Sequence, residues 1–196
     1  FDGKWQARVD YTFSRSYGNT EGQVKSDIGQ DDVSKTQDWD TAALMDHSYG
    51  LLATDPRPPL KVRGSYQLNP EWMRSGALRV QSGAPKSCLG YYGTNESDPS
   101  SYKSSYHWCA GSPSAPGDAG RNPWTKKLDL SVDYRPAFAD HKLAFSLDVF
   151  NVLNETKALQ SDATFEAAKY TVSNTYNQGI YFEAPRYVRL SASYDF

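Results

Sequence analysis

The stretch that decides the fold is Arg186-Tyr187-Val188-Arg189-Leu190-Ser191-Ala192-Ser193-Tyr194-Asp195-Phe196, at the end of the chain. Successive side chains of an extended strand point to opposite sides, so alternate residues share a face. One face is apolar and consists of Val188, Leu190, Ala192, Tyr194 and Phe196, and the other face is polar. A tilted strand of about ten residues with aromatic residues near its ends can cross a bilayer. The stretch therefore predicts a membrane-spanning strand.

Five earlier segments repeat this alternation. They read as strands rather than helices because the period of two persists through each of them. The third is the weakest, since only Leu78 and Val80 alternate with Arg79 and Gln81. The five segments are residues 5–14, 60–68, 78–81, 127–134 and 143–149.

The connections between these six segments alternate in length. Two are short, Asn69 to Trp72 and Arg135 to Asp140, whereas residues 15–59, 84–126 and 155–185 form long connections. Compact soluble domains rarely contain three structureless loops of that size. Outer-membrane barrels combine short periplasmic turns with long extracellular loops. The pattern predicts an all-β, antiparallel transmembrane β-barrel wall whose final strand ends on the periplasmic side.

The composition agrees with a barrel and disfavours other classes. The chain is 38% hydrophobic and 14% aromatic, and no apolar run reaches the roughly 18 residues of a transmembrane helix. Its mean hydropathy is −0.70, which a barrel tolerates because only alternate strand residues meet lipid. The net charge of −2, with both signs interspersed, gives no footprint for nucleic acid. The beginning of the chain shows no targeting signal and reads as the middle of a longer protein.

The two cysteines, Cys88 and Cys109, lie in a stretch rich in glycine, serine and proline. Two cysteines alone make a poor metal site, so a disulfide formed in an oxidising compartment is favoured over two free thiols. This pairing would place the stretch at the cell surface or in the periplasm.

The sequence contains no strong metal or catalytic motif. The acidic loop between Gly22 and Gly50 offers oxygen ligands to calcium, but its spacing does not match an EF-hand and a solvated loop is the better interpretation. His47, His107 and His141 are scattered over separate connections, and no hydrolase or metalloprotease motif occurs. We therefore expect no enzyme activity, no resident metal and no cofactor.

The hairpin formed by residues 127–134 and 143–149 allows a register to be predicted. Placing Val132 opposite Leu143 also puts Asp133 opposite Lys142 and Lys127 opposite Asp148, and such pairs stabilise a sheet. A shift by two residues would instead set Asp129 against Asp148, which is repulsive. We predict the first register.

Several motifs together carry a resemblance to a known family. They are Arg57-Pro58-Pro59-Leu60-Lys61-Val62, Ser82-Gly83-Ala84-Pro85, Leu128 to Tyr134 with the turn after it, Asp148 to Glu155, and Pro185 to Phe196. These segments resemble the end of a TonB-dependent outer-membrane receptor, and in style the Oar-like branch, over essentially the whole chain.

The resemblance implies a 22-stranded barrel that is closed by an N-terminal plug and moves a scarce ligand with energy from the inner-membrane TonB complex. Residues 1–196 would be the C-terminal segment, contributing the last six strands, with the plug, the earlier strands and the TonB-binding segment outside this sequence. The ending Tyr194-Asp195-Phe196 is similar to the signal that the barrel-assembly machinery reads. Outer-membrane lipid, the plug, TonB and that machinery are the implied partners, and the bacterial outer membrane is the implied location.

Two groups of residues are candidates for function within this picture. Polar strand residues would line the lumen and contact the plug, or simply form a hydrated wall of mixed charge pairs. These are Arg8, Asp10, Arg63, Arg79, Asp129, Asp148 and Arg189, together with Lys61, Lys127, Asp133 and Asp195. Loop aromatics would contact an extracellular ligand or surface protein, or else pack a small loop core. These are Tyr91, Tyr92, Tyr102, Tyr106 and Trp108.

Two other interpretations remain open from the residues alone. A secreted β-sandwich that binds carbohydrate would bury its apolar strand faces between two sheets. A barrel would instead present those faces, including Leu128, Phe145 and Leu190, to lipid. A smaller self-contained pore is the third possibility.

Overall fold

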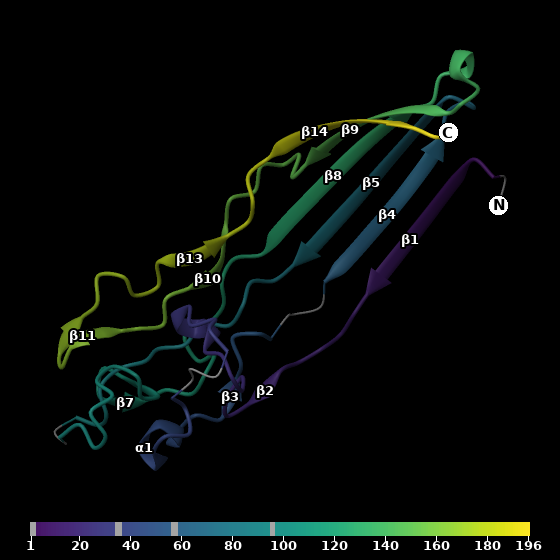
Figure 1. Ribbon diagram of the computed structural model, residues 1–196. Helices are drawn as coiled ribbons and strands as arrows, with labels where there is room; N and C mark the ends of the chain where they lie inside the picture. The colour runs from purple at the N-terminus through teal and green to yellow at the C-terminus, as the bar shows by residue number, and fades with distance from the viewer. Residues whose placement is uncertain (1–2, 34–36, 56–58, 95–96) are drawn as a thin grey trace.

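The computed structural model describes residues 3–33, 37–55, 59–94 and 97–196, and its main feature is one six-stranded antiparallel sheet (Figure 1). The strands follow one another in chain order: β1 (Trp5–Tyr11), β4 (Leu60–Gln67), β5 (Trp72–Gln81), β8 (Thr125–Tyr134), β9 (Leu143–Phe150) and β14 (Tyr187–Tyr194). All six segments predicted from side-chain alternation are therefore strands of this sheet. The third strand is longer than its alternating part, since it begins at Trp72.

The connections alternate in length as the sequence predicts. Residues 68–71 and 135–142 are short turns at one end of the sheet, and the second turn contains the 3-10 helix η2 (Ala137–Ala139). The described parts of the long connections, residues 12–59, 82–124 and 151–186, gather at the other end (Figure 1). Strand β14 ends beside the short turns, where the Asp195 N–H donates to the Lys142 carbonyl at 2.8 Å.

The long connections contain short elements of their own. The first holds β2 (Tyr17–Gly18), η1 (Ser26–Ile28), α1 (Ala42–Met45) and β3 (Gly50–Leu51). The second holds β6 (Trp108–Cys109) and β7 (Ser112–Pro113), and the third holds β10 (Ala158–Ser161), β11 (Glu166–Ala168), β12 (Thr171–Val172) and β13 (Gly179–Phe182). They pair as β2–β3, β6–β7, β10–β13 and β11–β12. Arg57 and Pro58 of the motif quoted above lie outside the described residues.

The predicted register of the β8–β9 hairpin is wrong. Val132 lies opposite Leu147 rather than Leu143, and Asp148 lies opposite Ser131 rather than Lys127. Asp133 faces Ser146, whose hydroxyl donates to it at 2.5 Å, and Lys142 is part of the turn. The pairing is shifted by four residues, which keeps every side chain on its predicted face.

The reason for this shift is a wide turn together with polar partners for the carboxylates. Asp140 and His141 both adopt the left-handed conformation, with φ of 50° and 60°, so the chain reverses over residues 135–142. In the observed register the Asp129 carboxylate accepts the Asn151 backbone N–H at 2.8 Å. Asp129 therefore stays away from Asp148, and the repulsion that excluded a shift by two residues does not arise.

The two faces of the sheet differ in chemistry, because residues directly opposite one another in the ladder share a face. One row of the apolar face consists of Ala7, Gly64, Gly76, Leu130, Val149 and Val188. Large side chains of the apolar face are exposed: Val188 is 58% accessible, and Leu190, in another row of this face, is 79% accessible. An apolar face that meets no other layer of the described chain requires an apolar environment.

The buried core of the described residues lies in the loops rather than under the sheet. Leu44, Leu89, Tyr106 and Ala163 are almost fully buried, and each comes from one of the three long connections. These connections pack together into one unit, which we call the loop module, comprising the described parts of residues 12–59, 82–124 and 151–186.

The secreted β-sandwich interpretation requires a second large sheet over the apolar face. Within the described ranges the other sheets are two-stranded and belong to the loop module. None of the helices in these ranges has the length and apolar character to cross a membrane.

Candidate functional site

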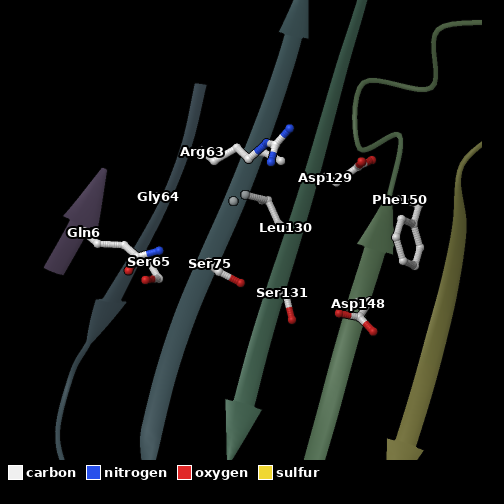
Figure 2. Close-up of a pocket in the computed structure, with 12 residues that line it drawn as sticks. Gln6, Arg63, Gly64, Ser65, Ser75, Asp129, Leu130, Ser131, Asp148 and Phe150 are labelled. Carbon is white, nitrogen blue, oxygen red and sulfur yellow. The ribbon is translucent and has the colours of Figure 1, made fainter. Parts of the chain in front are cut away.

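The polar face of the sheet has a hollow of about 290 Å³ near its centre. Figure 2 shows side chains from β1, β4, β5, β8 and β9 around it. The hollow exists because small residues meet across three strands: Ser65 lies opposite Ser75, and Ser75 lies opposite Ser131. Ala77 of the next row on this face also lines the hollow, as do Gly64 and Gly76, which have no side chain to fill it.

Charged groups stand on both sides of this hollow. Arg63 lies on β4, while Asp129 and Asp148 lie on β8 and β9 (Figure 2). Asp148 is paired with Arg189 of β14, whose Nη2 lies 2.9 Å from the carboxylate Oδ2. Arg63 forms no ion pair with any described residue, so its guanidinium is available to an external acceptor.

A row of three cations crosses the same face nearer the loop module. Lys61 lies directly opposite Arg79, and Arg79 lies directly opposite Lys127. Like charges directly opposite each other destabilise a sheet. Asp10 lies opposite Lys61, but its carboxylate accepts from Arg8 Nε at 2.8 Å. The row thus carries excess positive charge that fits an anionic partner.

The loop module is joined by backbone hydrogen bonds between all three long connections. Leu51 N–H donates to the Pro116 carbonyl at 2.8 Å, and Leu89 N–H donates to the Ala163 carbonyl at 2.8 Å. Ala163 N–H in turn donates to the Asp27 carbonyl at 2.9 Å. The three connections therefore form one folded body.

The predicted disulfide is confirmed, because Cys88 and Cys109 are bonded to each other. The bond lies beside the buried Leu89 and Tyr106, and Gly90 and Tyr106 exchange two backbone hydrogen bonds of 3.1 Å. The disulfide closes the second connection upon itself at the centre of the loop module.

The loop module also buries charged groups. Lys25 Nζ lies 2.7 Å from Asp38 Oδ1, and both side chains are less than a tenth exposed. Arg121 forms a second ion pair with the buried Asp55. Such pairs need further hydrogen bonds to offset lost hydration, and Thr20 donates to Asp38 at 2.9 Å.

Two buried titratable groups line a polar cavity of about 20 Å³ in this module. Burial raises the pKa of Asp27 to about 6, since a carboxylate loses hydration there. Burial lowers the pKa of His107 to about 4, because an imidazolium loses hydration in the same way. Their orphan atoms, Asp27 Oδ1 and His107 Nδ1, have no hydrogen-bond partner in the described part of the chain.

The five predicted ligand-binding aromatics occupy different positions. Tyr106 has no exposed surface and donates its hydroxyl to Asp98, so it belongs to the loop core. Tyr91, Tyr92, Tyr102 and Trp108 are partly exposed.

Only part of this group lies together. Tyr92 and Trp108 have ring centroids 5.2 Å apart, and His47 packs edge-on against Trp108 at 5.3 Å. Tyr92 and Asp46 also line a shallow depression beside α1, with a hydrogen bond of 3.2 Å between them. Ring faces beside a carboxylate can bind a polar ligand by stacking and hydrogen bonding.

The chain is similar to a transporter of known sequence. The chain is 30% identical over 175 residues to the TonB-dependent transporter Oar of Myxococcus xanthus, an alignment that covers 84% of this chain and 15% of Oar. The chain is a homologue of part of a TonB-dependent transporter. This homology places it in the bacterial outer membrane. No family model matches the chain.

Two solved structures share its fold. The ferric-catecholate import receptor Fiu from Escherichia coli K12, in a closed form, matches with a TM-score of 0.52 and 15% identity over 99% of this chain and 19% of Fiu. FpvA of Pseudomonas aeruginosa, bound to a heterologous pyoverdine with iron, matches with a TM-score of 0.51 and 16% identity over 98% of this chain and 18% of FpvA. The chain spans less than a fifth of the length of Oar and of each of these two structures. By their names, Oar is a TonB-dependent transporter and Fiu is an import receptor.

The polar residues that the sequence singled out as candidates lie on one face of the six-stranded sheet. Arg8, Arg63 and Asp129 fall in one row, Asp10 and Arg79 in the next, and Asp148 with Arg189 in a third. Sequence reasoning missed Asn151, which is buried and bonds both the Glu155 and Ala184 carbonyls, at 2.9 and 2.8 Å. Its signal is an asparagine directly after an alternating strand, where turn and cap residues occur.

Three of the acidic residues between Gly22 and Gly50 are engaged with side chains. Asp38 pairs with Lys25, Asp40 accepts from Tyr102, and Asp46 accepts from Tyr92. Across the described residues, no three His, Cys, Asp or Glu side chains come close enough to hold a metal ion.

Proposed function

We propose that this chain forms part of the wall and extracellular loops of a TonB-dependent transporter that moves a scarce ligand across the outer membrane. The observation that carries the proposal is the division of the six-stranded sheet into an exposed apolar face and a polar face with unpaired cations. A barrel wall needs both, because one face meets lipid and the other meets the lumen. In this proposal the wall belongs to a closed barrel of 22 strands.

The polar face contacts a plug formed by another part of the protein. The row Lys61, Arg79 and Lys127 binds plug carboxylates, because its like charges need counter-charges. The hollow below it binds a plug segment, with Arg63 as donor and Asp129 as acceptor. Arg8, Asp10, Asp148 and Arg189 line the same face as internal pairs that keep the wall hydrated.

The loop module faces the outside of the cell and contacts the transported ligand or a surface protein. The residues proposed for this contact are Tyr91, Tyr92, Tyr102 and Trp108. Among them, Tyr92 lines the shallow depression that it shares with Asp46. This proposal is supported by the partial exposure of these aromatic rings, which lie on a loop module cross-linked by the Cys88–Cys109 disulfide. Uptake or export is driven by the TonB complex through the plug.

The free edges of the sheet serve barrel closure and assembly. Within the described chain β1 and β14 are the outermost strands, and an unpaired edge must find a partner. We propose that β14 pairs with a strand from the rest of the protein, and that Tyr194 and Phe196 present the signal for the barrel-assembly machinery. Their rings lie 5.5 Å apart and both are exposed.

The test of the two faces uses the full-length protein in native outer membranes. Leu190→Cys and Arg63→Cys each place one reactive thiol, on the apolar or the polar face, since Cys88 and Cys109 are already bonded and any free cysteine elsewhere in the protein is replaced by serine. A fluorophore at position 190 should be quenched by nitroxide groups on lipid chains, whereas one at position 63 should not. Equal quenching at both positions would contradict a lipid-facing and a lumen-facing side.

The test of the plug contact uses charge reversal with a matched control. Lys127→Glu should increase amide exchange of the plug, because it places a carboxylate against plug carboxylates. Lys126→Glu changes the neighbouring residue, which lies on the apolar face, and should leave plug exchange unchanged. If Lys127→Glu has no effect on plug exchange, the cation row does not bind the plug.

A further inference from the structure

The apolar face of the sheet contains an arginine away from the loop module. Arg74 lies directly opposite Tyr66 on β4 and Val132 on β8, and its row continues with Leu147 and Leu190. The residue is exposed, and its side chain forms no ion pair or hydrogen bond with the described residues. The other charged residue in the strands of this face is Lys126, at the loop end of β8. A lipid-facing cation is costly in proportion to its depth, so Arg74 needs an explanation.

A groove of about 510 Å³ lies beside Arg74 on the same face. Its apolar lining is Trp72, Val132, Tyr134, Phe145, Leu147 and Leu190, with Ala192 at the far side. Two of these residues are direct neighbours of Arg74: Trp72 is two positions away on the same strand, and Val132 lies opposite. Residues in these two relations lie roughly 5 to 7 Å apart, so Arg74 lies next to two residues of the groove's lining.

The row next to Arg74 marks the level of the membrane interface. It contains Trp72, Tyr134, Phe145 and Ala192, and it lies beside the short turns. The Trp72 and Tyr134 rings stack with centroids 4.4 Å apart. Tryptophan and tyrosine gather where the hydrocarbon meets the headgroups. An arginine one row deeper can extend its side chain to headgroup phosphates while its methylene groups remain among apolar side chains.

We infer that Arg74 and this groove form a binding site for a glycerophospholipid of the leaflet on the short-turn side. The guanidinium binds the lipid phosphate, because its planar donors match two phosphate oxygens. One acyl chain lies in the groove against Leu147 and Leu190. The pairing of one isolated cation with an adjoining apolar groove favours an amphipathic anion over a second protein, whose apolar surface would leave the guanidinium without a counter-charge. This inference rests on the proposed function, since it requires the apolar face to meet lipid.

The experiment is native mass spectrometry of the full-length protein, released from detergent in the presence of phosphatidylglycerol and phosphatidylethanolamine. The wild-type protein should retain bound phospholipid, and Arg74→Gln should reduce the fraction retained by about ten-fold, as expected for the loss of a charge-assisted pair. Arg74→Lys should retain an intermediate amount, because a lysine cannot bind two oxygens in the same way.

Two controls make the result specific. Arg79→Gln removes the same charge from the same strand but from the polar face, and should not change lipid retention. Ala192→Phe fills the groove while leaving Arg74 in place, and should also reduce retention. Far-ultraviolet circular dichroism and heat-modifiable migration on gels report whether each variant is folded, and only folded variants are compared.

The inference is overturned if folded Arg74→Gln retains as much phospholipid as the wild type, or if Arg79→Gln loses as much. A dimer of the protein that dissociates on Arg74→Gln would show that a second copy occupies the groove instead. The nitroxide quenching at position 190 separates the two proposals. If position 190 is quenched and Arg74→Gln is silent, only the lipid site fails; if position 190 is not quenched, the proposed function fails first.

Discussion

Titration of Asp27 and titration of His107 should change the stability of the loop module in opposite directions as the pH varies. In the wild-type protein each pH dependence should therefore conceal the other. The pKa of Asp27 is raised by burial from its ordinary value of 3.8 to about 6. The protonated form is favoured in the folded module, so this contribution to stability is complete below pH 3.8 and is lost as the pH rises through 6. Each unit of difference between the unfolded and folded pKa values contributes about 1.4 kcal/mol to the free energy of unfolding, so the shift of Asp27 contributes about 3 kcal/mol in total.

His107 has the opposite sign over nearly the same interval. Burial lowers its pKa from 6.5 to about 4, so the neutral form is favoured in the folded module. Its contribution is complete above pH 6.5 and is lost as the pH falls through 4. The total is again about 3 kcal/mol. The two contributions nearly cancel between pH 4 and 6.5, and the wild-type module should change little in stability over this interval.

The single variants should reveal the hidden dependences. In Asp27→Asn the opening free energy of the loop module should rise by about 3 kcal/mol from pH 4 to 6.5, because only His107 still titrates. In His107→Gln it should fall by a similar amount, and the double variant should be flat again. Amide exchange near Leu89 and Tyr106 measures the opening free energy, after correction for the intrinsic pH dependence of exchange. Slopes that stay flat in both single variants would refute this account of the buried groups.

Two further predictions concern the supports of the loop module. Reduction of the Cys88–Cys109 bond, or Cys88→Ser with Cys109→Ser, should lower the opening free energy of the loop module by about 3 kcal/mol, because the bond restricts 21 residues of the open chain. Amide exchange before and after reduction measures this change, and unchanged exchange would contradict it. Asn151→Ala should lower the free energy of unfolding by about 3 kcal/mol, since it removes three side-chain hydrogen bonds at a buried position. The control is Asn154→Ala at an exposed position, and a decrease in melting temperature for Asn151→Ala no larger than that of the control would contradict the prediction.

The strands could be predicted from the sequence because their chemistry is local. Leu143 to Val149 alternates between apolar and polar residues whatever lies around it, since one face of the sheet is apolar and the other polar. The same reasoning found the polar-face candidates, because a residue's face follows from its parity along the strand. The first part of β5 escaped prediction because Arg74 and Gly76 occupy its apolar face and hide the alternation.

The register and the loop core could not be predicted for a physical reason. The register of β8 and β9 depends on partners outside the hairpin, since Asp148 pairs with Arg189 and Asp129 with the Asn151 backbone. The loop core combines Leu44, Leu89, Tyr106 and Ala163 from three distant segments with no common period. The sequence therefore left Tyr106 open between ligand contact and packing of a loop core, and it is the largest fully buried side chain of the described residues.

The mutual hydrogen bonding of the three long connections affects how the outer surface can be changed. Because Leu51, Leu89 and Ala163 each depend on a backbone group from another connection, one loop transplanted alone into a different protein would lose its supports. Substitutions in separate loops should be epistatic, since groups that share partners do not add independently. A graft of the loop module would have to carry all three segments together, and an antibody raised against the folded module should recognise none of them as an isolated peptide.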